Sequence, residues 1–306
     1  EDGIDTIVTC DNGIAAAEEI AYGRQKGLTI IVTDHHEVPY EIVNGERNYI
    51  FPDADVIIDP KQPGCEYPFK ELCGAGVAWK LICALGVDEE ILIQTLQLAA
   101  FATIGDIVSL QGENRILAKK GLELINKLKT VSEYYDSYSE YEEMDFVDDY
   151  ESESYDIVKN AQKSAAILGL NALINVTGYT DKNIGAFEVG FILGPCINAA
   201  GRLDDAMNAV NLFLTDDYEE ALVIASKINE LNNTRKNMTL DAVNRAIRII
   251  SQEGLADNNV IVCYIPDCHA ALAGLVAGRI TAQYYKPTII LTDAMGDFEG
   301  QAKASA

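Results

Sequence analysis

The sequence predicts an α/β protein in which a parallel sheet and its helices are joined by a long helix to a second, smaller α/β unit. Near the start, two short apolar runs rich in β-branched residues, Ile4–Thr9 and Leu28–Thr33, flank a helical pattern over residues 14–26. Strand, helix and strand with short connections make a βαβ unit, which implies a parallel sheet. Residues 216–254 form one long helical pattern, and strand, helix and strand patterns recur over residues 260–292.

The elements between and after these signals follow from local patterns. Asp55–Asp59, followed by Pro60, predicts a third strand of the first sheet. Apolar residues at three- and four-residue spacing then predict three helices. The long helical pattern has a polar middle, as helices that bridge two domains often do. The remaining segments are the helices at residues 75–85, 88–104 and 115–128, the polar middle at 232–237, the strands at 260–265 and 288–292, and the helix at 271–284.

Residues 131–158 differ from the rest of the chain. They hold eleven acidic residues and six tyrosines but no lysine or arginine. Because like charges at this density repel one another and resist packing, we expect a disordered insertion. A functional alternative is an acidic docking segment.

Composition restricts the class of protein. The formal net charge of −25 is the opposite of the basic footprint of a general nucleic-acid binder, so a polyanionic substrate would need local cations. No apolar stretch approaches the roughly 20 residues that span a bilayer. The seven cysteines are scattered and odd in number, which argues against a disulfide framework and favours a reducing cytoplasm.

Two loops that follow neighbouring strands carry potential metal ligands. Asp11 follows the first apolar run, and Asp34, His35 and His36 follow the second. Open α/β sheets build their sites at the carboxyl ends of their strands, so these side chains are expected to meet. Imidazole nitrogen and carboxylate oxygen suit Zn²⁺, Mn²⁺ or Fe²⁺. The alternatives are a surface turn that holds two histidines and, for Asp11, a cap for a helix that begins at Ile14.

Asp106 lies within an apolar run, Ala102–Val108. A carboxylate in such a run is either capped and paired or a ligand, because an isolated charge there is costly. Asp11, His35 and Asp106 could hold one divalent ion well. The two-metal arrangement used for in-line attack on phosphorus needs more ligands than these three.

Two further stretches suit phosphate. Asn198 and Arg202 lie in a run of small residues that lets backbone approach a ligand, and the Arg202 guanidinium matches phosphate oxygens. An ion pair of Arg202 with Asp204 or Asp205 is the alternative. His269 and Arg279 flank a glycine-containing helical run and could bind anions, although a tightly packed helix with an exposed arginine fits equally well.

These pieces, in this order, resemble the DHH phosphoesterase superfamily and, within it, the RecJ-type single-strand-specific 5′→3′ DNA exonucleases. Asp11 in V-T-C-D-N-G-I resembles the second family motif, Asp34–His36 the third, and Asp106 in A-T-I-G-D-I-V the fourth. Y-P-F-K-E-L-C-G-A-G-V-A-W-K-L and N-A-A-G-R-L are similar to RecJ-type segments. H-A-A-L-A-G-L-V-A-G-R-I and A-K-A-S-A resemble the DHH-associated C-terminal domain.

The resemblance implies a metal-dependent exonuclease of DNA repair and recombination, with two Mn²⁺ (or Mg²⁺) ions in the intact enzyme. It implies that Asp11 bridges the ions, that His35 and Asp106 are further ligands, and that Asp34 and His36 orient the site. Asn198, Arg202, His269 and Arg279 would bind the single-stranded DNA. A single-strand-binding protein or a helicase is the candidate protein partner, and no membrane is expected.

The resemblance divides the chain into five parts, and the first family motif is missing from it. We therefore expect this chain to be catalytically incomplete, with little or no activity of its own. The expected parts are an N-terminally incomplete DHH domain at residues 1–130, the insertion at 131–158, the remainder of the DHH domain at 159–215, the connecting helix at 216–254 and a truncated DHH-associated domain at 255–306.

Two other functions remain open. One is a phosphodiesterase of the same superfamily that acts on oligoribonucleotides or cyclic dinucleotides, which would prefer short substrates to long DNA. The other is a catalytically inactive DHH-type binding or scaffold protein. Asp11, His35 and Asp106 weigh against the inactive protein if the parent gene encodes the first family motif.

Overall fold

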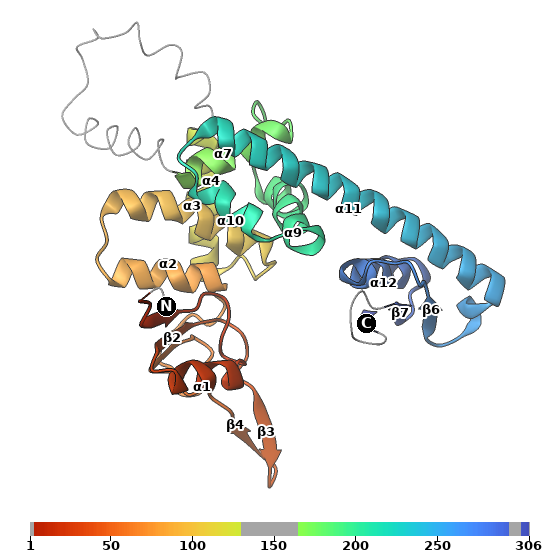
Figure 1. The fold of residues 1–306 in the computed structure, drawn as a ribbon, viewed down its shortest axis with the longest axis horizontal. Helices are drawn as coiled ribbons and strands as arrows, with labels where there is room; N and C mark the ends of the chain where they lie inside the picture. The colour runs from red at the N-terminus through yellow and green to blue at the C-terminus, as the bar shows by residue number, and fades with distance from the viewer. Residues whose placement is uncertain (1–2, 130–164, 294–300, 306) are drawn as a thin grey trace, which may run out of the picture. The chain divides into compact units, whose positions relative to one another are not determined.

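A computed structural model describes residues 3–129, 165–293 and 301–305 (Figure 1). The expected insertion at residues 131–158 lies outside these residues. The chain divides into two compact units: unit 1 comprises residues 1–194 and 213–221, and unit 2 comprises residues 195–212 and 222–306. Residues 195–212, which the sequence analysis placed with the first domain, thus group with unit 2.

A three-stranded parallel sheet forms the N-terminal part of unit 1. Its strand order is β1 (Thr6–Val8), β2 (Thr29–Thr33) and β5 (Val56–Ile58). Helix α1 (Ala17–Gln25) connects β1 to β2, and Ile20 belongs to the same apolar cluster as two residues of β2. The predicted βαβ unit and its parallel sheet are therefore confirmed.

Helix α1 begins three residues later than the sequence pattern predicts. The Ile14 N–H donates to the Asp34 carboxylate, and the Ala16 N–H donates to the Gly13 carbonyl, so this segment forms a turn. Ala16 occupies the N-cap position and makes no side-chain cap. The alternative interpretation of Asp11 as the cap of a helix beginning at Ile14 is therefore wrong.

Six helical segments complete unit 1 within the described residues. The three helices predicted over residues 75–128 are present, with boundaries shifted by a few residues. The segments are α2 (Gly74–Ala84), α3 (Glu89–Gly105), α4 (Gly112–Leu128), α7 (Ala165–Val176), the short α8 (Ala186–Glu188) and the π-helix η1 (Val189–Leu193). Helices α3 and α4 approach closely at Gly121, where an added Cβ would lie 2.1 Å from the Ala100 Cβ.

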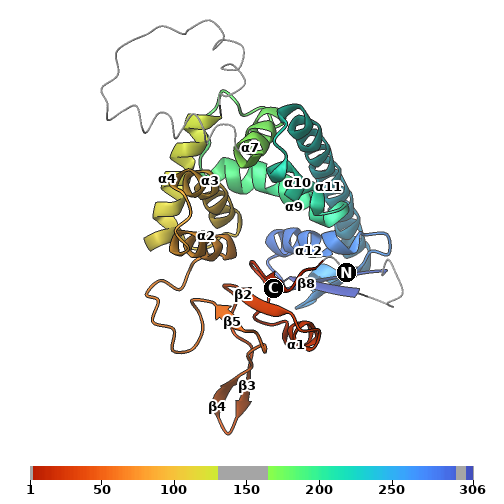
Figure 2. The same ribbon diagram turned by 60° about the vertical axis from the view of Figure 1, so that its left-hand side comes forward.

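An antiparallel hairpin, which the sequence analysis did not predict, extends from unit 1. Its strands are β3 (Tyr40–Val43) and β4 (Glu46–Tyr49), and they form a sheet of their own. Asn44 and Gly45 have φ values of 54° and 85°, as a type I′ turn requires. Figures 1 and 2 show the hairpin pointing away from β1, β2 and β5.

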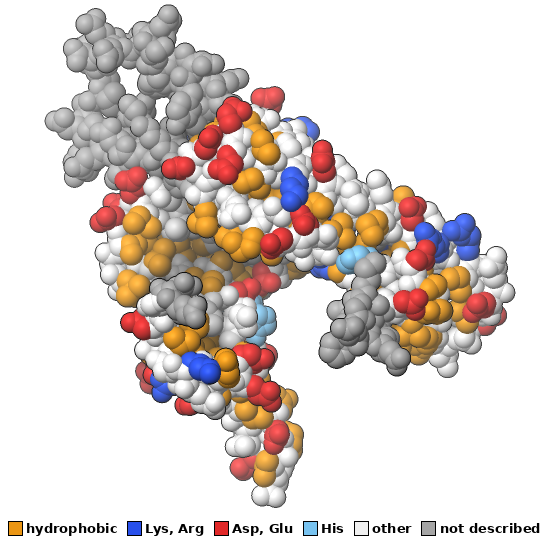
Figure 3. Space-filling view, viewed as in Figure 1, with side chains coloured by type: hydrophobic (Ala, Val, Ile, Leu, Met, Phe, Trp, Pro, Cys, Tyr) orange, Lys and Arg blue, Asp and Glu red, His pale blue; other side chains and the backbone are white. Residues whose placement is uncertain are grey.

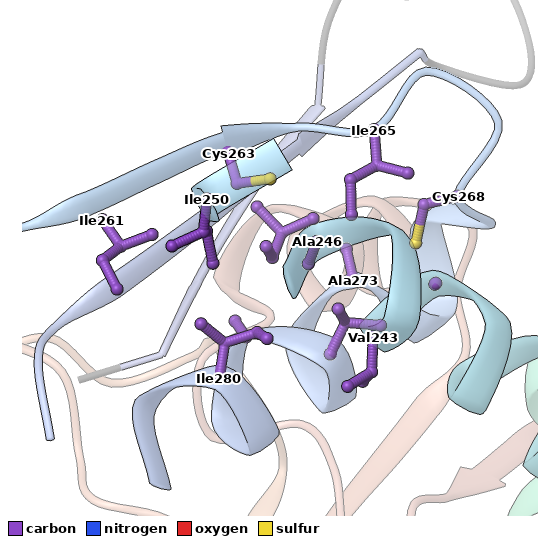
Figure 4. Packing of buried hydrophobic residues seen from close by; sticks show 13 residues of the cluster. Val243, Ala246, Ile250, Ile261, Cys263, Ile265, Cys268, Ala273 and Ile280 are labelled. Atoms are coloured by element: carbon purple, nitrogen blue, oxygen red, sulfur yellow. The ribbon is translucent and has the colours of Figure 1, made fainter. Parts of the chain in front are cut away.

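Unit 2 is a smaller α/β unit with a three-stranded sheet. Strand β6 runs parallel to β7, and β7 runs antiparallel to β8. The C-terminal part of α11 packs on α12 and β6 through Val243, Ala246 and Ile250 (Figure 4). The predicted long helix and second α/β unit are confirmed. The elements here are α9 (Gly194–Leu203), α10 (Met207–Leu214, which ends in unit 1), α11 (Tyr218–Glu253, which begins there), η2 (Leu255–Asp257), β6 (Ile261–Tyr264), α12 (Ala270–Tyr284), β7 (Thr288–Thr292) and β8 (Gln301–Ser305).

The surface has the acidic character that the composition predicts. Figure 3 shows Asp and Glu side chains spread over the visible face of each unit, in a chain with 48 acidic residues against 23 lysines and arginines. No disulfide joins any of the seven cysteines, all of which lie among the described residues. Among the described residues, no helix has the length and apolar character needed to cross a bilayer.

We predict that Gly121→Val lowers the free energy of unfolding by about 1–3 kcal/mol, because its side chain would overpack the contact between α3 and α4. The control is Gly105→Ala at the end of α3, where an added Cβ meets nothing within 4 Å. This control should be neutral or slightly stabilising. Urea unfolding measures both, and equal midpoints for the two variants would contradict the close packing.

Candidate functional site

The parallel sheet brings two loops of potential ligands to one edge. The ladder continues beyond the strands, since the Asp11 N–H donates to the Thr33 carbonyl at 3.1 Å and the Asp34 N–H donates to the Ile58 carbonyl at 3.0 Å. These bonds fix the loops after β1 and β2 side by side. The sheet edge expected from the sequence is therefore where the candidate ligands lie.

His35 lies at the centre of this edge. Its side chain is 10% exposed, and its Nε2 atom lies 2.9 Å from Asp11 Oδ1 and 3.6 Å from Asp106 Oδ2. Asp106 reaches the edge from the C-terminal end of α3, where its N–H donates to the Ala102 carbonyl. Three groups that are far apart in the sequence thus converge on one point.

Asp34 is buried and points the other way, into the loops. Its carboxylate accepts hydrogen bonds from the N–H groups of Ile14 (2.9 Å) and His35 (2.7 Å), and it contacts His36 Nδ1 at 2.7 Å. Burial alone would raise the pKa of this carboxyl, but these donors outweigh burial and lower the pKa. Asp34 therefore stays ionised and positions its neighbours.

His36 contacts Asp34 through one ring nitrogen, Nδ1, and its other ring nitrogen is Nε2. The hydrogen bond to Asp34 raises the pKa of His36 above its usual value, and the side chain is 58% exposed. A carboxylate on Nδ1 leaves Nε2 to face a ligand, which is the arrangement around metal-bound histidines. Asp11, His35 and His36 each offer a ligand atom within 4.8 Å of the others. The donor set of this edge, oxygens and imidazole nitrogens, fits a divalent cation.

The backbone at Asp11 is strained and closely packed. Asp11 has φ 61°, a conformation that residues with side chains rarely adopt outside functional sites. Gly74, the first residue of α2, lies against it, so that a Cβ on Gly74 would be 2.4 Å from Asp11 Oδ1. Glycine at this position allows the start of α2 to hold the Asp11 carboxylate in place.

The sequence analysis missed a fourth carboxylate at this edge. Asp59 directly follows β5 and is 2% exposed; Oδ1 accepts the Lys61 N–H at 2.7 Å, and Oδ2 has no partner among the described residues. Burial, and then the Asp34 charge, raise the pKa of Asp59. The signal was present, because the predicted strand at residues 55–59 ended on this aspartate.

The candidate phosphate ligands lie in unit 2, where the structure adds a third arginine. Arg235, in the polar middle of α11, has its pKa lowered by burial and by the charges of Arg202 and Arg279. Arg202 donates to the Ala271 carbonyl at 3.0 Å. No ion pair joins any of the three to a carboxylate in the part of the chain that is described. We call Arg202, Arg235 and Arg279 the arginine cluster.

The alternative partners of Arg202 are engaged elsewhere. Asp204 pairs with Lys227 at 2.8 Å, and Asp205 Oδ1 accepts the Met207 N–H. Asn198 is exposed on α9, on the helix that carries Arg202. His269 occupies the N-cap position of α12, where Nδ1 accepts the Ala271 N–H at 3.3 Å, so this residue has a capping role that the sequence did not indicate.

Comparisons with known proteins agree with this geometry. Residues 4–104 match the family described as the DHH family, N-terminal domain. The chain is 35% identical to the single-stranded-DNA-specific exonuclease RecJ of Bacillus subtilis, over 100% of this chain and 32% of that protein. It is 30% identical to RecJ of Escherichia coli K12, over 95% of this chain and 46% of that protein. The chain thus spans about a third to a half of these relatives.

Solved structures of RecJ also match the chain. RecJ of Thermus thermophilus in complex with Mn²⁺ matches with a TM-score of 0.67 and 28% identity, over 94% of this chain and 36% of that one. Its complex with Mg²⁺ matches with a TM-score of 0.60 and 27% identity, over 94% and 34%. Residues 4–104 thus match the N-terminal domain of the DHH family, and the chain as a whole is similar in sequence and in fold to part of the RecJ exonucleases.

Proposed function

We propose that the protein containing this chain is a single-stranded-DNA-specific 5′→3′ exonuclease that hydrolyses phosphodiester bonds with divalent metal ions. The observation that carries the proposal is the convergence of Asp11, His35 and Asp106, with His35 Nε2 at 2.9 and 3.6 Å from the two carboxylates. Relatives named as RecJ exonucleases, one of them solved both with Mn²⁺ and with Mg²⁺, support it.

In this proposal Asp11, His35 and Asp106 hold metal, with two ions in the complete site. A bound divalent ion would polarise the phosphoryl group and offset the negative charge that develops during hydrolysis. Asp34 holds Nδ1 of His36, which would favour the tautomer whose Nε2 can accept a ligand. Asp34 and His36 would therefore orient the site. Asp11, whose carboxylate packs against the start of α2, would be a ligand.

Binding of the strand falls to unit 2 in this proposal. Three guanidinium groups without a carboxylate partner repel one another, so a phosphate anion beside them is favoured. Asn198 and His269 lie on the helices that carry Arg202 and Arg279. The same proposal includes the domain boundaries expected from the sequence and a single-strand-binding protein or helicase as partner. It also includes a cytoplasmic location, which suits seven cysteines that form no disulfide.

The direct test is Mn²⁺-dependent digestion of a 5′-labelled single-stranded oligonucleotide. We expect the protein that contains this chain to release 5′-mononucleotides and to lose that activity in Asp11→Asn. Asp53→Asn, which removes a charge from an exposed loop, is the control and should retain activity. A protein that binds the oligonucleotide without cutting it would favour the scaffold function, and one that cuts only di- or trinucleotides would favour the oligonucleotide phosphodiesterase.

A second prediction concerns His36. Its pKa in the metal-free chain should lie above the ordinary value of about 6.5 and should fall in Asp34→Asn. Because the folded pKa is raised, the Asp34–His36 interaction stabilises fully below about pH 6.5 and is lost as the pH rises through the folded pKa. With three histidines in the chain, NMR titration can resolve His36 directly. A His36 pKa at or below the ordinary value would contradict the interaction.

A third prediction concerns the arginine cluster. Arg235→Gln should weaken binding of single-stranded DNA about tenfold for any sequence and reduce the salt dependence of log K by about 0.7. The control is Arg245→Gln on the same helix, whose arginine already pairs with Asp267. Fluorescence anisotropy at several salt concentrations measures both. Equal losses in the two variants would mean a general charge effect and no site at the cluster.

A further inference from the structure

The hairpin β3–β4 has two chemically different faces. The register pairs Tyr40 with Tyr49 and Ile42 with Arg47, and alternation of side chains places these four residues on one face, which we call the tyrosine face. The opposite face carries Glu41, Val43, Glu46 and Asn48. The hairpin thus separates its arginine from both of its carboxylates.

The side chains of the tyrosine face contact one another but remain exposed. The two tyrosine rings lie 5.9 Å apart, and the Arg47 guanidinium lies 4.5 Å above the Tyr40 ring. Seven of the eight strand residues are exposed, with Ile42 at 63% and Tyr40 at 45%. A two-stranded hairpin with no packed face is marginally stable alone. The exposed apolar and aromatic surface is therefore suited to contact with something else.

The position of the hairpin links this face to the candidate metal centre. Three residues separate His36 from Tyr40, so the two lie at most about 14 Å apart along an extended chain. The Ile50 N–H donates to the Pro39 carbonyl at 2.8 Å, which closes the base of the hairpin. Glu37, in the connecting segment, pairs with Lys61 at 3.4 Å. Arg47 has no ion-pair partner among the described residues.

We propose that the tyrosine face is a second contact site for single-stranded DNA, next to the metal centre, at which bases stack on Tyr40 and Tyr49 and Arg47 contacts the backbone. This inference rests on the proposed function. Exposed aromatic rings beside a guanidinium bind single strands without sequence preference, since every base has a face that can stack. Both carboxylates of the hairpin lie on the other face, so only this face suits a polyanion.

The test is binding of a labelled single-stranded oligonucleotide to the full chain without metal. We expect the pair Tyr40→Ala and Tyr49→Ala to weaken binding about tenfold or more, and Arg47→Gln to weaken it several-fold and lower the salt slope by about 0.7. The matched controls are Tyr22→Ala and Arg24→Gln on α1 of the same unit; Tyr22 is exposed beneath Lys26, and Arg24 pairs with Asp55. Both controls should bind as the unaltered chain does.

Because the tyrosine substitutions could unfold the hairpin, a second measurement uses the unaltered chain. Photocrosslinking to an oligonucleotide that carries 5-iodouracil should label a peptide containing Tyr40 or Tyr49. If the hairpin variants bind the oligonucleotide with wild-type affinity and crosslinks form only outside the hairpin, this inference is overturned. The tyrosine face would then suit a protein partner, and the proposed function would be unaffected. Absence of any DNA binding by the unaltered chain would overturn the inference together with the DNA-binding part of the proposed function.

Discussion

The buried Asp34 carboxylate is the group on which the candidate metal centre depends. Its backbone N–H continues the ladder from β5, while its side chain holds the N–H of Ile14 and both the backbone and the ring of His36. A carboxylate without these donors would be costly to bury, and the donors without the carboxylate would be left unsatisfied. One side chain therefore joins the loop after β1 to the loop after β2 and sets the direction of the His36 imidazole.

The distribution of charge differs between the two units. Unit 1 gathers carboxylates at one sheet edge, where Asp11, Asp34, Asp59 and Asp106 surround His35 and His36. Unit 2 gathers three arginines with no carboxylate partner among the described residues. In a chain with a net charge of −25, the proposed affinity for a polyanion would come from local cations and from stacking.

The sequence predicted those features that depend on local patterns. Alternating and helical periodicity identified the βαβ unit and the long helix, and the Asp-His-His run marked the sheet edge, because burial of a strand or helix face leaves a trace in the sequence. The hairpin left a weaker trace: Asn44-Gly45 is a strong turn signal, but strands exposed on both faces show no simple apolar alternation. Asp59 did carry a signal, since the predicted third strand ended on it, but its burial depends on the register of β5. Arg235 could not be assigned, because what surrounds it depends on the packing of α11.

The crowding of acids at the sheet edge has an energetic consequence for the fold itself. Burial raises the pKa of Asp59, and the neighbouring Asp34 charge raises it further. The negative charges at this edge therefore repel one another. Asp11 adds backbone strain at φ 61°. A divalent cation bound at this edge would offset the repulsion among these carboxylates, and it would stabilise the folded form by mass action because the separated loops offer no such site. Metal binding would then be coupled to the stability of unit 1 through the loops after β1 and β2.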